Sequence, residues 1–255
     1  MVIDSHAHLL DPLLRDRAEE ILRDLRQDGV ECIVEVGTDF KDSRMSLKFA
    51  EAHDNVYCTI GVHPMFAGTY DTGFEEWAIA QKSEKIVAVG ECGLDYFHMD
   101  YPKDVQRETF VRQIKLAARL GLPLVVHSRD AFEDMYETLN ANKKFLKNGV
   151  ILHCFSGGAE EVERFKAFDA YFAFGGAVTY KNACKAAEAI RVVPENRLLI
   201  ETDCPYLAPV PFRGQINEPK NVKIVAERIA AITNLTFDEV AKLTTANARR
   251  IINRT

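Results

Sequence analysis

Eight short apolar runs, most of them rich in Val and Ile, recur along the chain, and longer amphipathic stretches separate them. Near-continuous β-branched runs are typical of parallel strands that are buried on both faces of a sheet. Strands that alternate with helices predict βαβ units and hence a parallel sheet. The runs lie at residues 2–3, 31–36, 56–60, 86–89, 123–126, 150–152, 170–174 and 198–200.

The stretches between these runs repeat apolar residues at helical spacing. Between Arg15 and Gln27 the apolar residues form one face, and Gly29 follows as a stop signal. Two further helical patterns near the C-terminus would complete an outer ring of helices. Helices are predicted over residues 15–27, 105–120, 160–168, 183–190, 222–232 and 237–243.

Eight strands in a chain of 255 residues predict an α/β protein of the (β/α)₈ TIM-barrel type, because such a barrel needs about 250 residues. We therefore expect one domain over residues 1–255, with no linker. An open, doubly wound parallel sheet is the competing fold. No Gly-x-Gly-x-x-Gly motif follows the first apolar run, so the dinucleotide-binding version of that sheet loses support.

Charge and cysteine usage narrow the class of protein. Lys and Arg total 32 against 38 Asp and Glu, a net charge of −6, which argues against a protein that coats duplex DNA with a basic surface. Nucleic acid held through bound metal ions remains compatible with this charge. The N-terminus lacks the apolar core of a signal peptide, no run approaches a membrane span, and the six cysteines form no CxxC pair. We expect a cytoplasmic protein with reduced thiols and no membrane association.

The residues that carry chemistry fall at the carboxyl ends of the predicted strands, where barrel enzymes build their active sites. In His6-Ala7-His8 the two imidazoles alternate along a strand, so both can point to the same face. That motif alone is weak, but four histidines and two carboxylates at five strand ends form a much stronger pattern. The candidate metal ligands are His6, His8, Glu91, His127, His153 and Asp203.

Imidazole and carboxylate groups together suit a divalent metal site, and six ligands suffice for two ions if Glu91 bridges them. A bridged pair of ions can clamp the attacking and leaving oxygens of a hydrolysis and lower the pKa of water. The alternative is that some of these histidines are core residues with satisfied hydrogen bonds, or residues that cap turns or helices at the surface.

Four further residues lie beside the candidate ligands. Cys92, Cys154 and Cys204 each directly follow a candidate ligand, so on a continuing strand they point to the opposite face. We interpret them as packing residues, unless a bend in a strand exposes one. Glu201 lies two residues before Asp203 and either orients a ligand or forms a buried salt bridge.

Three residues are candidates for substrate binding. His63, in Gly61-Val62-His63-Pro64, either contacts substrate or caps a turn. Arg129 follows His127 by two residues and either holds an anion or pairs with a neighbouring carboxylate. Arg213 lies in a Pro- and Gly-bearing loop after the eighth strand, where it either binds phosphate or is an ordinary solvated arginine.

From Asp4 to Arg249 the chain resembles the TatD-like metal-dependent deoxyribonucleases, within the wider amidohydrolase class of barrels. The motifs are highly specific when taken together, and no metal-ligand position is missing. They are Asp4-Ser5-His6-Ala7-His8, Gly61-Val62-His63-Pro64, Gly90-Glu91-Cys92-Gly93-Leu94-Asp95, His127-Ser128-Arg129-Asp130, His153-Cys154-Phe155-Ser156-Gly157, Glu201-Thr202-Asp203-Cys204-Pro205, and Arg213-Gly214 with Asn217-Glu218-Pro219.

The resemblance implies two divalent ions that share Glu91, and the ligand set leaves open whether they are Mg, Mn or Zn. It also implies hydrolysis of phosphodiester bonds in DNA, as a 3′–5′ exonuclease on single-stranded ends. The implied ligands are His6, His8, Glu91 and Asp203 for one ion, and Glu91, His127 and His153 for the other.

In the mechanism expected from this resemblance, the ions polarise the scissile phosphoryl group and bind the attacking water. Asp203 accepts the proton of that water, and Glu91 acts as the shared carboxylate. Phosphates are held by His63, Arg129 and Arg213.

Two other classes of function remain open. The same metal site would serve a hydrolase of a small amide, lactone or aminoacyl ester, because the metal ligands alone do not select the substrate. A metal-stabilised binding protein without enzymatic activity is the second alternative. The anion-holding arginine Arg213 favours a phosphate-bearing substrate, DNA or an oligonucleotide, and no obligate protein partner is evident.

Overall fold

A computed structural model describes residues 1–253 of the chain. All eight predicted strands are present, although three of them extend further toward their carboxyl ends than the apolar runs do. The strands are β1 (Val2–Ala7), β2 (Val30–Val36), β3 (Val56–Ile60), β4 (Ile86–Asp95), β5 (Leu124–Arg129), β6 (Val150–Leu152), β7 (Tyr171–Phe174) and β8 (Leu198–Ile200).

The strands form one eight-stranded sheet in the order of the sequence, from β1 to β8. The strand pairings are parallel, and beyond β8 a bridge joins Cys204 to Ala7 at the end of β1. This is the topology of the (β/α)₈ barrel, so the predicted fold class is confirmed. None of the helices formed by residues 1–253 combines the length and the apolar character needed to cross a membrane.

Helices connect the strands. The predicted helix over 15–27 is shorter than expected, whereas the last helix runs ten residues past its predicted end, to Asn253, because apolar positions such as Ala248 and Ile252 continue its buried face. The helices are α1 (Ala18–Asp24), α2 (Phe40–Ala52), α3 (Thr72–Ala80), α4 (Lys103–Leu120), α5 (Phe132–Ala141), α6 (Ala159–Phe165), α7 (Cys184–Val192), α8 (Val222–Thr233) and α9 (Phe237–Asn253).

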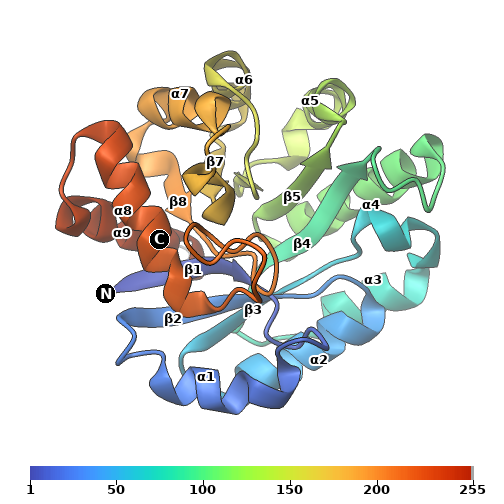
Figure 1. The fold of residues 1–255 in the computed structure, drawn as a ribbon. Helices are drawn as coiled ribbons and strands as arrows, with labels where there is room; N and C mark the ends of the chain where they lie inside the picture. Colours follow the sequence, from blue (N-terminus) through green and yellow to red (C-terminus); the bar gives the residue numbers. More distant parts are fainter. Residues whose placement is uncertain (254–255) are drawn as a thin grey trace. The chain divides into compact units, whose positions relative to one another are not determined.

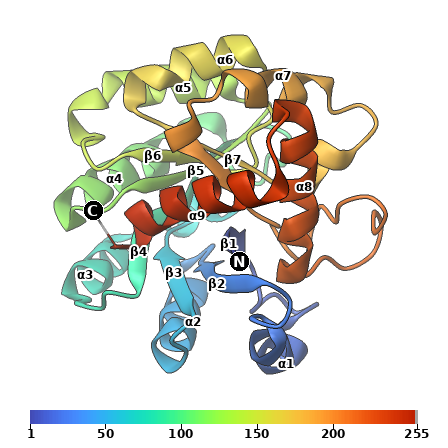
Figure 2. The ribbon, with the colours of Figure 1, turned by 90° about the vertical axis from the view of Figure 1, so that its left-hand side faces the viewer.

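The chain divides into two compact units, which we call the terminal and the central unit. The terminal unit contains residues Met1–Glu35, Cys154–Ala167 and the chain from Tyr171 onward. Within it, α9 packs against β1 and β8, and Figure 2 shows α9 running in front of β1. The prediction of a single domain over residues 1–255 stays a prediction.

The central unit contains residues Val36–His153 and Phe168–Ala170. Its longest strand, β4, is buried at all ten positions and lies beside β5, as Figure 1 shows. Gly93 of β4 is paired with His127 of β5. A Cβ atom at Gly93 would lie 2.1 Å from the carbonyl oxygen of His127, so only glycine permits this close approach.

Candidate functional site

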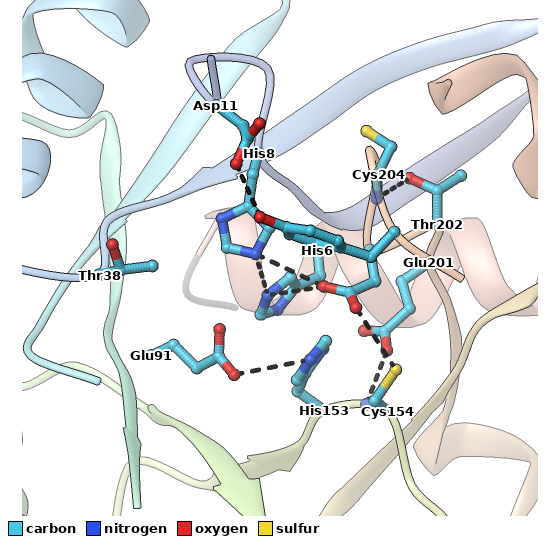
Figure 3. Close-up of polar contacts among 12 residues, drawn as sticks. His6, His8, Asp11, Thr38, Glu91, His153, Cys154, Glu201, Thr202 and Cys204 are labelled. Carbon is cyan, nitrogen blue, oxygen red and sulfur yellow. Dashed lines mark hydrogen bonds and ion pairs between the residues drawn. The ribbon is translucent and has the colours of Figure 1, made fainter. Parts of the chain in front are cut away.

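In the terminal unit, two histidines and one aspartate form a group that we call the terminal cluster. His6 lies in β1, His8 follows its end, and Asp203 follows β8. The Nε2 atoms of His6 and His8 are 3.3 Å apart, and Oδ1 of Asp203 lies 3.8 Å from His6 and 3.4 Å from His8. Ligands bound about 2.1 Å from one tetrahedral ion stand roughly 3.4 Å apart, so this arrangement suits a single cation. Figure 3 shows the two imidazoles converging.

A buried hydrogen-bond network holds Asp203 beside these histidines. Asp203 has a left-handed backbone conformation, with φ of 57°, and its amide donates to the carbonyl of His6 over 3.0 Å. The preceding Thr202 donates to the carboxylate of Asp4 through its amide, at 2.8 Å, and through its hydroxyl, at 2.5 Å. Burial raises the pKa of Asp4 to about 8, against the opposing effect of these bonds. The first strand is thus tied to the turn that presents Asp203.

In the central unit, a second group comprises Glu91, His127 and His153, which we call the central cluster. Oε1 of Glu91 lies 2.7 Å from Nδ1 of His127 and 3.6 Å from Nε2 of His153. Figure 3 shows the second of these contacts. Glu91 and His127 lie within β4 and β5, whereas His153 directly follows β6. One carboxylate and two imidazoles again form a donor set that suits a divalent ion.

His127 lies between two carboxylates. Its Nε2 is 3.1 Å from Oδ2 of Asp95, opposite the Nδ1 contact with Glu91. Burial disfavours the charged form of the His127 ring and so lowers its pKa. The hydrogen bonds with Asp95 and Glu91 together have the larger effect, and the pKa of His127 is raised. Burial likewise opposes ionisation of Asp95, yet its bonds with His127 and His98 hold the pKa of Asp95 well below its usual value. A carboxylate on the far nitrogen is the usual device that orients a metal-binding histidine.

Asp95 ends the motif Gly90–Asp95 in the sequence, but no role of its own is predicted for it there. It lies four residues after Glu91 on the same strand, and residues at i and i+4 of a strand share a face. That alternation is the signal that could have identified it, but the apolar run ends at Val89 and the predicted strand ended there too.

His63, a predicted substrate contact, lies against the central cluster. Its Nε2 is 3.7 Å from Oε1 of Glu91, and its ring is in edge contact with that of His127. Nδ1 accepts a hydrogen bond from the amide of Met65, so His63 also caps the turn that follows. Because Nδ1 is an acceptor, Nε2 carries the proton and can donate it to an anion.

The two predicted phosphate-binding arginines share one arrangement. The guanidinium carbon of Arg129 lies 4.1 Å from the centroid of Phe97, and that of Arg213 lies 4.3 Å from the centroid of Tyr180. Both arginines are exposed, and within residues 1–253 neither guanidinium forms a salt bridge or a hydrogen bond. Their N–H groups are therefore available to an anion.

The cysteines only partly follow their predicted role. Cys92 and Cys204 are fully buried packing residues, as expected. Cys154 is not, because β6 ends at Leu152 and a φ of 45° turns the thiol to 4.0 Å from Oδ2 of Asp203. Glu201, for which a ligand-orienting role or a salt bridge was expected, accepts the amide hydrogen of Cys154 at 2.7 Å (Figure 3).

Comparison with known proteins is consistent with these donor sets. The family model described as "TatD related DNase" matches residues 3–253. The chain is 43% identical to the uncharacterized metal-dependent hydrolase YabD of Bacillus subtilis, over 98% of both chains. It is 36% identical to the uncharacterized metal-dependent hydrolase YcfH of Escherichia coli K12, over 99% of this chain and 96% of the relative.

Solved structures agree with the sequence relatives. The crystal structure of YJJV, a TatD homologue from Escherichia coli K12, matches with a TM-score of 0.91 and 30% identity, over 98% of this chain and 97% of that one. A TatD-family hydrolase from Entamoeba histolytica, 23% identical with a TM-score of 0.84, shares the fold. The chain described here belongs to the TatD family of metal-dependent hydrolases.

Proposed function

We propose that the chain hydrolyses phosphodiester bonds in DNA, as a 3′–5′ exonuclease on single-stranded ends, with two bound divalent ions. The observation that carries the proposal is the presence of two donor sets, one in each unit, each with histidine and carboxylate ligand atoms that lie within 4.8 Å of one another. His6, His8 and Asp203 would hold one ion, and Glu91, His127 and His153 the other. A bound divalent ion polarises phosphoryl oxygens and lowers the pKa of water toward neutrality.

Asp203 is the residue that we expect to accept the proton of the attacking water. Its side chain is 13% exposed, so water can reach it, and its position is fixed by the hydrogen bonds to β1. The Glu91 side chain is only 4% exposed and is surrounded by three imidazoles. Glu91 therefore suits the role of a ligand, and Asp203 suits that of the general base.

The expected substrate contacts can all donate hydrogen bonds to an anion. His63 presents its Nε2–H beside Glu91, and Arg129 and Arg213 present unpaired guanidinium groups. Guanidinium groups bind phosphate oxygens in a bidentate manner, which supports a phosphate-bearing substrate over a neutral amide or lactone. DNA or an oligonucleotide is thus the proposed partner, and the cytoplasm remains the proposed location.

The test uses end-labelled single-stranded and duplex DNA of the same sequence. Metal-stripped protein is assayed alone and after addition of Mg²⁺, Mn²⁺ or Zn²⁺, with Asp203→Asn as the control variant. We expect a ladder that shortens from the 3′ end of the single strand, requires metal and disappears in the variant.

Cleavage inside the strand, or from the 5′ end, would refute the exonuclease assignment while retaining the nuclease. Absence of cleavage with every metal, in protein that binds two ions, would refute the nuclease. A small amide, lactone or aminoacyl ester would then be the substrate to test.

A further inference from the structure

The loop after β4 presents an aromatic ring to solvent in a way that core packing does not explain. Phe97 is 58% exposed, and the neighbouring Met99 is also largely exposed. Arg129 covers one side of the Phe97 ring at 4.1 Å, and Lys103 lies 3.9 Å from the ring centroid of the adjacent Tyr96. Two cations therefore stand over two consecutive aromatic residues of one short loop.

The Phe97 ring is held in place by its backbone. The amides of Phe97 and His98 donate to Oδ1 of Asp95 at 3.0 and 2.7 Å, and the His98 ring contacts Oδ2 at 3.1 Å. Asp95 is buried, and its Oδ2 also contacts His127. A single carboxylate thus fixes both a candidate metal ligand and the loop that bears Phe97, so the exposed ring is preorganised close to the central cluster.

The charges around the ring define the ligand that it suits. Arg129 pairs with no carboxylate among residues 1–253, so its N–H groups can bind a phosphate while its guanidinium carbon lies over the ring. An aromatic face next to an unpaired guanidinium is the combination that binds a base and its phosphate in single-stranded nucleic acids. An isolated exposed phenylalanine needs no explanation by itself, but a ring whose loop is fixed by a buried carboxylate and which lies under an arginine does.

We propose that Phe97 and Arg129 form a binding site for one unpaired nucleobase and its phosphate, which determines selection of base-bearing, single-stranded substrates. The base stacks on Phe97 and Arg129 contacts the phosphate. This inference rests on the proposed nuclease function. It adds to that function the residues that recognise the base and its phosphate.

The test compares two hexamers with the same phosphates, hexathymidylate and a hexamer of abasic tetrahydrofuran nucleotides. Steady-state constants are measured for the wild type, Phe97→Leu and Phe97→Trp, in the presence of the activating metal. The matched control is Tyr171→Leu, because Tyr171 also lies under an arginine, Arg197 at 4.8 Å, but at the amino end of a strand.

We expect Phe97→Leu to raise KM for hexathymidylate about tenfold with little change in kcat, and to leave the abasic hexamer unaffected. Phe97→Trp should retain the preference for bases, and Tyr171→Leu should behave as wild type. Equal losses on both hexamers, or no loss on either, would overturn the base site and leave the nuclease intact. If the wild type cleaves neither hexamer, the nuclease function is overturned instead, and the base site with it.

Discussion

The terminal and central clusters present their carboxylates in opposite ways. Asp203 stands in a turn with a left-handed backbone, after β8 has ended, and its side chain is 13% exposed. Glu91 lies inside a strand that is buried along its whole length, with 4% of its side chain exposed. A carboxylate that water can reach suits proton transfer, whereas one enclosed by imidazoles suits permanent ligation. The two clusters should therefore respond differently to the loss of their carboxylates.

The largest effect is expected from Asp203→Asn. Because the amide cannot accept a proton, kcat should fall about 10³-fold. Asparagine tolerates the left-handed conformation, so the fold should be kept and the melting temperature should change little. Steady-state kinetics and thermal denaturation check this outcome. Asp169→Asn is the matched control, since Asp169 has a φ of 54° but lies outside both clusters. Wild-type turnover by folded Asp203→Asn would exclude the proposed proton transfer.

Glu91→Gln should cost about 100-fold in activity at limiting metal, because a ligand is weakened rather than a proton acceptor removed. Excess metal should then restore a large part of the activity, which it should not do for Asp203→Asn. Activity titrated against free metal concentration distinguishes the two variants. If metal rescues neither or both alike, the assignment of different roles to the two carboxylates is wrong.

Asp95→Asn tests the orientation of His127. Asparagine can still accept a hydrogen bond from His98 or His127, but it lacks the negative charge that favours a proton on Nε2 of His127. We expect metal affinity to weaken about tenfold. Calorimetric titration of metal into stripped protein measures this, and Asp104→Asn, on the exposed first turn of α4, serves as a control. Unchanged affinity would mean that Asp95 only shapes the loop.

The smallest effect is expected at the support of Asp203. Thr202→Val keeps the shape of the side chain but removes the hydroxyl that donates to the buried Asp4. The free energy of unfolding should fall by about 1–3 kcal/mol. Thr244→Val is the control, because among residues 1–253 the Thr244 hydroxyl bonds only within its own helix, to Val240 and Ala241. Equal values for the two variants in urea denaturation would contradict a specific role for the Asp4–Thr202 link.

Much of this architecture follows from local sequence pattern. Every strand coincides with an apolar run, and most of these runs are rich in β-branched residues, because the strands of a barrel are buried on both faces. Helices such as α2 and α3 were not identified individually, although Asp39 and Asp71 cap their first turns and could have marked them. The continuation of β4 beyond Val89 could not be predicted, because the stretch Gly90–Gly93 is rich in glycine and glycine ordinarily weakens a strand.

The site divides in the same way. The candidate ligands could be predicted because they follow the apolar runs of the sequence, and their metal-binding role stays a prediction. The partners of those ligands depend on contacts between distant segments, as with Thr202 and Asp4, and no local pattern encodes such pairs. Cys154 was misplaced because its orientation depends on where β6 ends, which the apolar run does not fix.

The most direct test of the account is the metal content of the protein. Wild type, His8→Gln and His153→Gln are loaded with one divalent metal, dialysed and analysed by elemental mass spectrometry alongside Asp169→Asn. We predict two ions per chain in the wild type and the control, and one in each histidine variant. Equal metal content in all four proteins would contradict the claim that the terminal and central clusters each hold an ion.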